Sequence, residues 1–140
     1  NISNVTLHST NLQFWKPGMK INLESSLKVG DPLHGHMVQG HVDGIGTVSS
    51  IARVAGSYIL EISYPPSMAK YISRKGSISL DGVSLTVNST ENTSLKVNIV
   101  PYTWQNTSLQ YREIGDKMNI ETDLVARYLE TLLQQRNATE

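Results

Sequence analysis

An internal repeat constrains this chain more than any other feature of its sequence. Residues 6–27 align without a gap with residues 103–124, at a constant offset of 97 positions. Nine of the 22 aligned positions are identical, among them the pair Asn22 and Asn119. Self-similarity of this length indicates two copies of one folding unit. We therefore expect the two segments to be the same closing elements of two similar units.

The repeat also predicts how the chain is divided. If the second unit opens near His36 and closes near Leu124, the first unit should open roughly 60 residues before Asn1. The 140 residues then hold only the end of the first unit and all of the second. The predicted parts are the tail of a first barrel (1–33), a second barrel (34–122), and a C-terminal helix with its tail (123–140).

Short alternating stretches, punctuated by Gly, Pro and Asn, make up most of the chain. Many short strands of this kind indicate a small barrel or sandwich. The end of the chain differs, because from Leu124 the apolar residues recur at helical spacing and Asp123 is placed to cap the first turn. The predicted class is therefore all-β with one C-terminal helix. We expect strands within residues 36–51, 57–63, 77–87, 94–100 and 117–121, and a short helical turn over 66–73.

Composition narrows the functional classes. The 12 basic residues are balanced by 12 acidic ones, so the basic excess typical of nucleic-acid binders is missing. The absence of cysteine excludes thiolate metal sites and Cys nucleophiles from these residues. Six N-x-S/T sequons would matter only in a secreted protein. Neither a secretory pattern nor an apolar run of roughly 20 residues is present, so we expect a cytoplasmic protein, with an organelle as the alternative.

Two hydroxyl side chains stand out in residues 75–87, KGSISLDGVSLTV. This motif predicts a strand pair or a bulged strand, in which Gly82 permits a bulge that shifts the register by one residue. After that shift, Ser84 and Thr86 share the face opposite the apolar residues. The pair belongs either to a plain solvent-facing surface or to a polar pocket.

Two imidazoles, His36 and His41, lie five residues apart around Gly40. No thiolate or acidic ligand spacing accompanies them, so a metal site is not expected. Each is either an ordinary hydrogen-bonded histidine or a proton carrier. A hydrolase triad assembled from Ser84, His41 and Asp81 has no G-x-S-x-G elbow to support it.

Four motifs, taken together and in this order, resemble the riboflavin synthase α-chain family, which is built from two lumazine-binding repeats. The resemblance covers essentially the whole chain. It implies two tandem six-stranded Greek-key barrels and a C-terminal helix through which three subunits associate, with this chain matching the tail of the first barrel and all of the second. The motifs are GHMVQGHVDGIG (35–46), KGSISLDGVSLTV (75–87), VPYTWQNTSL (100–109), and the paired INLE (21–24) and MNIETD (118–123).

The resemblance implies a riboflavin synthase activity. In that reaction one molecule of 6,7-dimethyl-8-ribityllumazine gives a four-carbon unit to another, forming riboflavin and 5-amino-6-ribitylamino-uracil in the last step of riboflavin biosynthesis. No metal and no organic cofactor is implied. The expected partners are the lumazine substrate, two further copies of the chain, and lumazine synthase. The alternative is a non-catalytic lumazine or flavin carrier of the same superfamily.

Carried over residue by residue, the resemblance assigns the pocket. The catalytic candidates are Ser84, beside the reacting ring, and His41, the best match for proton transfer ahead of His36. In the family the active site forms between the first barrel of one subunit and the second barrel of its neighbour. The substrate-binding candidates are Gly40, Val42, Lys75, Asp81, Leu85, Thr86, Ile99, Val100, Pro101, Tyr102, Thr103, Trp104 and Asp123, and the internal repeat adds Asn4 and Thr6 in the equivalent pocket of the first barrel. Tyr102 stands where the family commonly has His or Glu.

Overall fold

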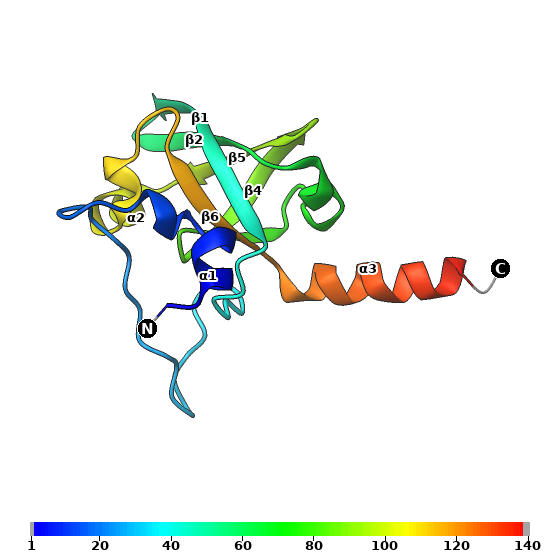
Figure 1. Cartoon of the computed structure of the whole chain (residues 1–140). Coiled ribbons are helices and arrows are strands. Elements are labelled where there is room, and N and C mark those ends of the chain that lie inside the picture. Colours follow the sequence, from blue (N-terminus) through cyan, green and yellow to red (C-terminus); the bar gives the residue numbers. More distant parts are fainter. Residues whose placement is uncertain (1, 139–140) are drawn as a thin grey trace.

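The six strands of the described residues close into one antiparallel barrel in the order β1-β2-β5-β4-β3-β6, which confirms the predicted fold class. The computed structural model describes residues 2–138. A long N-terminal segment precedes the barrel, and the last helix projects away from it (Figure 1). The strands are β1 (Gly44–Val54), β2 (Ser57–Ser63), β3 (Ser77–Leu80), β4 (Val83–Glu91), β5 (Ser94–Ile99) and β6 (Lys117–Thr122).

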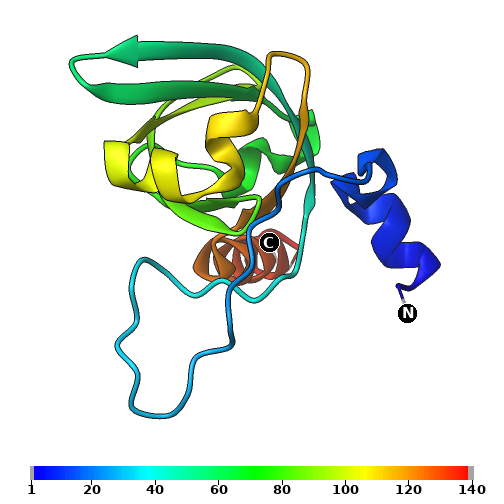
Figure 2. The same cartoon turned by 90° about the vertical axis from the view of Figure 1, so that its left-hand side faces the viewer.

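The strand order contains a Greek key. β3, β4 and β5 follow one another and pair as neighbours, and β6 then returns to lie beside β3. The return is a long connection that carries helix α2 (Pro101–Asn106) and the 3-10 turn η3 (Ser108–Tyr111). Figure 2 looks into the barrel and shows that α2 and η3 cover one part of its rim.

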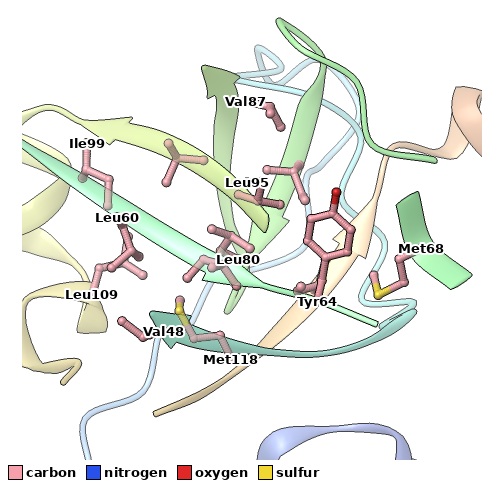
Figure 3. Packing of buried hydrophobic residues seen from close by; sticks show 14 residues of the cluster. Val48, Leu60, Tyr64, Met68, Leu80, Val87, Leu95, Ile99, Leu109 and Met118 are labelled. Atoms are coloured by element: carbon pink, nitrogen blue, oxygen red, sulfur yellow. The ribbon is translucent and has the colours of Figure 1, made fainter. Parts of the chain in front are cut away.

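Alternating side chains fill the barrel interior. In β5, for example, Leu95, Val97 and Ile99 are fully buried, while Lys96 and Asn98 between them face outward. Figure 3 shows how the apolar side chains of several strands meet inside the barrel. The buried hydrophobic core consists of Val48, Leu60, Ile62, Tyr64, Met68, Ile78, Leu80, Val87, Leu95, Val97, Ile99, Leu109, Met118 and Ile120.

Two details of the predicted strands are wrong. The first strand begins at Gly44 rather than near residue 36, because the preceding backbone pairs with a side chain instead of a strand: the amides of Gln39 and Gly40 donate to the two carboxylate oxygens of Glu121, at 2.8 and 2.9 Å. Of the two alternatives for residues 75–87, the strand pair is confirmed and the bulge at Gly82 is wrong: Asp81 and Gly82, at φ +48° and +82°, form a two-residue hairpin turn between β3 and β4.

Both helical predictions are confirmed. α3 spans Leu124–Asn137, and the Asp123 carboxylate caps it by accepting from the amide of Val125 at 3.0 Å. The expected turn after the two prolines is a 3-10 helix, η2 (Pro66–Tyr71). Among residues 2–138, no helix has the length and apolar character needed to span a bilayer.

The internal repeat is visible in the structure. α1 (Asn4–Ser9) and η1 (Asn11–Phe14) reproduce α2 and η3 at the same offset of 97 residues. Their caps, Thr10 and Thr107, share nearly the same backbone angles and each donates its hydroxyl to a carbonyl four residues earlier, at 2.7 Å. Residues 20–25, which the repeat equates with β6, are not a strand, because no described strand lies beside them to complete a ladder.

Reciprocal hydrogen bonds hold the N-terminal segment on the barrel. The side-chain Oδ1 atom of Asn119 accepts from the backbone amide of Asn11, and Oδ1 of Asn22 accepts from the backbone amide of Ser108, both at 2.6 Å. Asn22 corresponds to Asn119 in the repeat, and Asn11 corresponds to Ser108. The two contacts are therefore related by a local pseudo-twofold axis. Asn22 also donates through Nδ2 to the carbonyl of Asp81, at 2.8 Å.

Replacing Asn22 with Ala is expected to loosen this attachment and to destabilise the protein by about 1–2 kcal/mol, because the amide of Ser108 loses its acceptor. Urea unfolding measures the loss, and hydrogen exchange at the Ser108 amide should accelerate. Gln13→Ala is the matched control, since that side chain is exposed on the same segment. Unchanged exchange at Ser108 in Asn22→Ala would contradict the assignment.

Candidate functional site

A polar cavity of about 330 Å³ lies on the outer face of β3, β4 and β5, beside α2. It follows from strand alternation: the inward positions of these strands are apolar, so the outward positions are free to carry polar groups. Ser77 and Thr86 are direct partners across the β3–β4 ladder, which places two hydroxyls side by side. The lining residues are Gly35, Ser77, Ser84, Leu85, Thr86, Asn98, Val100 and Thr103.

The loop before β1 closes one side of this cavity and contacts Ser84. The Nδ1 atom of His36 lies 2.7 Å from the Ser84 hydroxyl oxygen, although 48 positions separate the two residues in the chain. Gly35 adopts φ +84°, and a β-carbon there would lie 2.8 Å from the Ser84 β-carbon. The family resemblance ranked His36 behind His41, and sequence spacing does not show which loop residue reaches β4.

Five of the predicted site residues gather at the cavity, and they come from two motifs. Three are on β4 and two lie at the start of α2. Sequence reasoning missed Gly35, Ser77 and Asn98, although the alternation of β3 and β5 already placed Ser77 and Asn98 on the outer face. The five are Ser84, Leu85, Thr86, Val100 and Thr103.

Several other predicted residues near the cavity have structural roles or different surroundings. Ile99 is fully buried in the core. Trp104 stacks on Tyr58 with ring centroids 4.1 Å apart. Tyr102, with Pro101 before it, is exposed on α2.

The remaining candidates lie away from this cavity. Asn4 and Thr6, which the repeat assigns to the first barrel, are exposed on α1, where their polar groups bond within the first turns. Lys75 is exposed, with φ +68°, and its amide donates to the carbonyl of Val87 at 2.7 Å. Asp123 caps α3.

A second cavity, of about 260 Å³, lies where the N-terminal segment meets the barrel. Gly40, Val42 and Asp81 line it together with residues of both parts. Asp81 is almost entirely buried and pairs with Arg112 at 2.8 Å. Its Oδ1 atom also accepts from the amide of Asn119 at 2.8 Å and from Nδ2 of Asn11 at 3.0 Å.

The electrostatics of Asp81 combine opposing effects. Burial raises the pKa of Asp81 above its ordinary value, whereas the charge of Arg112 and the donors from Asn119 and Asn11 lower it. The geometry makes this carboxylate the point where the hairpin turn, the long β5–β6 connection and the N-terminal segment meet. Its contacts thus give Asp81 a structural role.

The loop that carries His41 is held through its backbone on both sides. Glu121 binds the amide of Gly40, and the carbonyl of His41 accepts from Arg127 at 2.8 Å. Arg127 also pairs with Asp43 at 2.9 Å. The His41 side chain itself is exposed and makes no hydrogen bond with the described residues. Sequence reasoning missed Glu121. The identical residue Glu24 in the first copy of the repeat could have pointed to it.

The described part of the chain, residues 2–138, contains no group of three His, Asp or Glu side chains that could hold a metal ion. The donors and acceptors at the first cavity are instead hydroxyls, an amide and an imidazole. Such groups bind polar edges of neutral heterocycles and orient them through hydrogen bonds.

Comparisons with known proteins show which proteins this chain resembles. Residues 39–123 match the model of the lumazine binding domain family. The riboflavin synthase of Actinobacillus pleuropneumoniae is 36% identical over 140 residues, which are 100% of this chain and 65% of that protein. The riboflavin synthase of Brucella abortus is 40% identical over 128 residues, covering 91% of this chain and 63% of that protein. This chain thus spans somewhat less than two thirds of either relative.

A solved structure shares the fold. The crystal structure of LumP complexed with riboflavin superimposes with a TM-score of 0.78 at 24% sequence identity, covering 84% of this chain and 64% of that one.

Proposed function

This chain belongs to the lumazine-binding domain family, and from that premise we propose that it carries the lumazine-binding and catalytic surface of a riboflavin synthase. The reaction would be the dismutation of two molecules of 6,7-dimethyl-8-ribityllumazine. The single observation that carries the proposal is the cavity outside β3–β5, which collects the hydroxyls of Ser84 and Thr86 with the start of α2. These are the positions that the family resemblance assigns to the substrate.

The chemistry of the cavity suits this substrate. A lumazine ring presents carbonyl oxygens and ring nitrogens along its edge, which hydroxyl and amide groups can bind. Ser77, Ser84, Thr86 and Asn98 supply such groups on one face. A cavity of about 330 Å³ is at the small end for ligand sites and suits one bicyclic ring.

The reaction needs two rings in contact, so a second lumazine-binding surface must supply the other. We assign that role to a neighbouring subunit, reached from the side where the His41 loop lies. The imidazole of His41 is exposed there, and the loop is fixed by Glu121 and Arg127. An imidazole held in this way can accept a proton from one ring and return it to the other.

Helix α3 supports association into a homotrimer. It projects from the barrel (Figure 1), and an apolar stripe with helical spacing is exposed along it. A stripe of this kind is normally covered in an assembly. Its members are Val125, Tyr128, Leu129, Leu132 and Leu133. Association with lumazine synthase stays a prediction.

One assay separates the possible functions. The protein is mixed with 6,7-dimethyl-8-ribityllumazine, and absorbance and fluorescence are followed over time. Riboflavin formed over many turnovers supports the synthase. Lumazine that is bound but unchanged supports the carrier, and lack of binding contradicts both. The sedimentation behaviour of the same sample tests the trimer.

Replacing His41 with Ala should separate turnover from binding. We expect kcat to fall about 100-fold, the low end for a proton-transfer residue because water reaches this exposed loop, with little change in lumazine affinity. Steady-state kinetics and a fluorescence titration measure the two effects. His34→Ala, an exposed histidine earlier in the same loop, is the control. Equal losses of turnover and affinity would contradict a catalytic role for His41.

A further inference from the structure

The surroundings of the His36 ring determine which partner donates in the hydrogen bond between His36 and Ser84. His36 Nδ1 lies 2.7 Å from the Ser84 hydroxyl oxygen. The other ring nitrogen, Nε2, is buried and has no hydrogen-bond partner among the described residues. A neutral imidazole carries one proton, on one nitrogen or the other. The surroundings of the two nitrogens therefore decide which tautomer is present.

The two tautomers are not equally compatible with this site. A proton on Nε2 would be a buried N–H without an acceptor, which folded proteins rarely contain. A proton on Nδ1 is shared with Ser84 and leaves only an unused lone pair on Nε2, which is better tolerated. In the favoured tautomer His36 donates and the Ser84 oxygen accepts.

From this geometry we infer that His36 is a positioning residue that turns the Ser84 hydroxyl into a hydrogen-bond donor directed at the ligand. Among residues 2–138 the Ser84 hydroxyl has no other side-chain partner, and it lines the cavity beside Thr86 and Ser77. With its oxygen occupied by His36, its hydrogen is free to point into the cavity. The ligand must then present an acceptor there.

The inference rests on the proposed function for the identity of the ligand and narrows its chemistry. A heterocycle with a carbonyl oxygen or an unprotonated ring nitrogen facing Ser84 satisfies the hydroxyl. A ring with an N–H or a methyl group at that point leaves it unpaired. Sites built to hydrogen-bond a particular group of the ligand discriminate strongly between ligands that can and cannot pair with it.

The first experiment reads the tautomer in the ligand-free protein. A long-range ¹H–¹⁵N NMR spectrum of the ¹⁵N-labelled chain distinguishes a protonated from an unprotonated ring nitrogen. We expect His36 to carry its proton on Nδ1. A proton on Nε2 would overturn the inference and would leave the proposed function standing. His36→Gln identifies the resonance.

The second experiment compares replacements of His36 by their affinity for 6,7-dimethyl-8-ribityllumazine. Asn places an amide N–H near the position of Nδ1, whereas Gln places its amide near Nε2. We expect His36→Asn to stay within about threefold of the original affinity, and His36→Gln and Ser84→Ala each to lose about tenfold, the usual worth of one hydrogen bond. The urea midpoint of each variant shows whether it is folded.

The double variant His36→Gln/Ser84→Ala tests the coupling. Because His36 acts through Ser84, the double variant should bind no worse than Ser84→Ala alone. Additive losses would overturn the inference. If the unsubstituted protein does not bind lumazine, the proposed function and the ligand assigned here are overturned. That result differs from a proton on Nε2 and from additive losses, which overturn only the role of His36.

Discussion

Replacing Arg112 with Met should destabilise the protein by about 3 kcal/mol or more near pH 8, because the buried carboxylate of Asp81 loses the one charge partner it has among residues 2–138. The side chains of this pair are only 6% and 7% exposed, so water cannot take the place of the guanidinium. Urea unfolding followed by tryptophan fluorescence measures the loss.

Two further variants give this prediction its controls. Asp81→Asn combined with Arg112→Met removes both charges but keeps an oxygen for the donors from Asn119 and Asn11, so it should recover most of the lost stability. Lys96→Met breaks the exposed pair with Glu61, at 3.6 Å, and should cost less than about 1 kcal/mol. Similar losses in Arg112→Met and Lys96→Met would contradict the assignment.

The destabilisation by Arg112→Met should depend on pH in a defined direction. Burial raises the pKa of Asp81, and Arg112 is the largest effect that opposes it, so the pKa should rise further in the variant. A carboxyl group with a raised pKa in the folded state takes up a proton more readily when folded than when unfolded. The penalty is therefore full above that pKa and declines as the pH falls through it. A penalty that grows on acidification would contradict this account.

Replacing Gly35 with Ala is expected to weaken lumazine binding by about 30-fold, corresponding to about 2 kcal/mol of overpacking. The added β-carbon would lie only 2.8 Å from the β-carbon of Ser84, and closer still to the Ser84 hydroxyl oxygen. Ser84 cannot move away without losing its contact with His36 or its place in β4. Fluorescence titration of Gly35→Ala with 6,7-dimethyl-8-ribityllumazine measures the change.

Gly30→Ala is the matched control for this clash. Gly30 has a similarly positive φ of +96°, but a β-carbon there meets nothing within 4 Å. Both variants therefore carry the backbone strain of a non-glycine residue in this region, and only Gly35→Ala carries the clash with Ser84. Equal effects of the two variants on affinity would show that the clash has no part in binding.

The repeat and the strand alternation were sufficient to predict much of the fold. Both are local properties: a strand exposes alternate side chains whatever it packs against, and an aligned repeat carries its own caps and turns with it. The turn at Asp81 shows the limit. Its two residues are compatible with a bulge or a tight hairpin, and only the partner strand, through the pairing of Leu80 with Val83, decides between them.

The candidate site divides in the same way. The sequence alone determined that Ser84 and Thr86 share a face, because two residues of one strand separated by one position always do. Only the tertiary structure decided that His36 rather than His41 reaches Ser84, and that Arg112 neutralises Asp81. The physical reason is that loop conformation and long-range pairing depend on contacts between residues dozens of positions apart, which no local periodicity encodes.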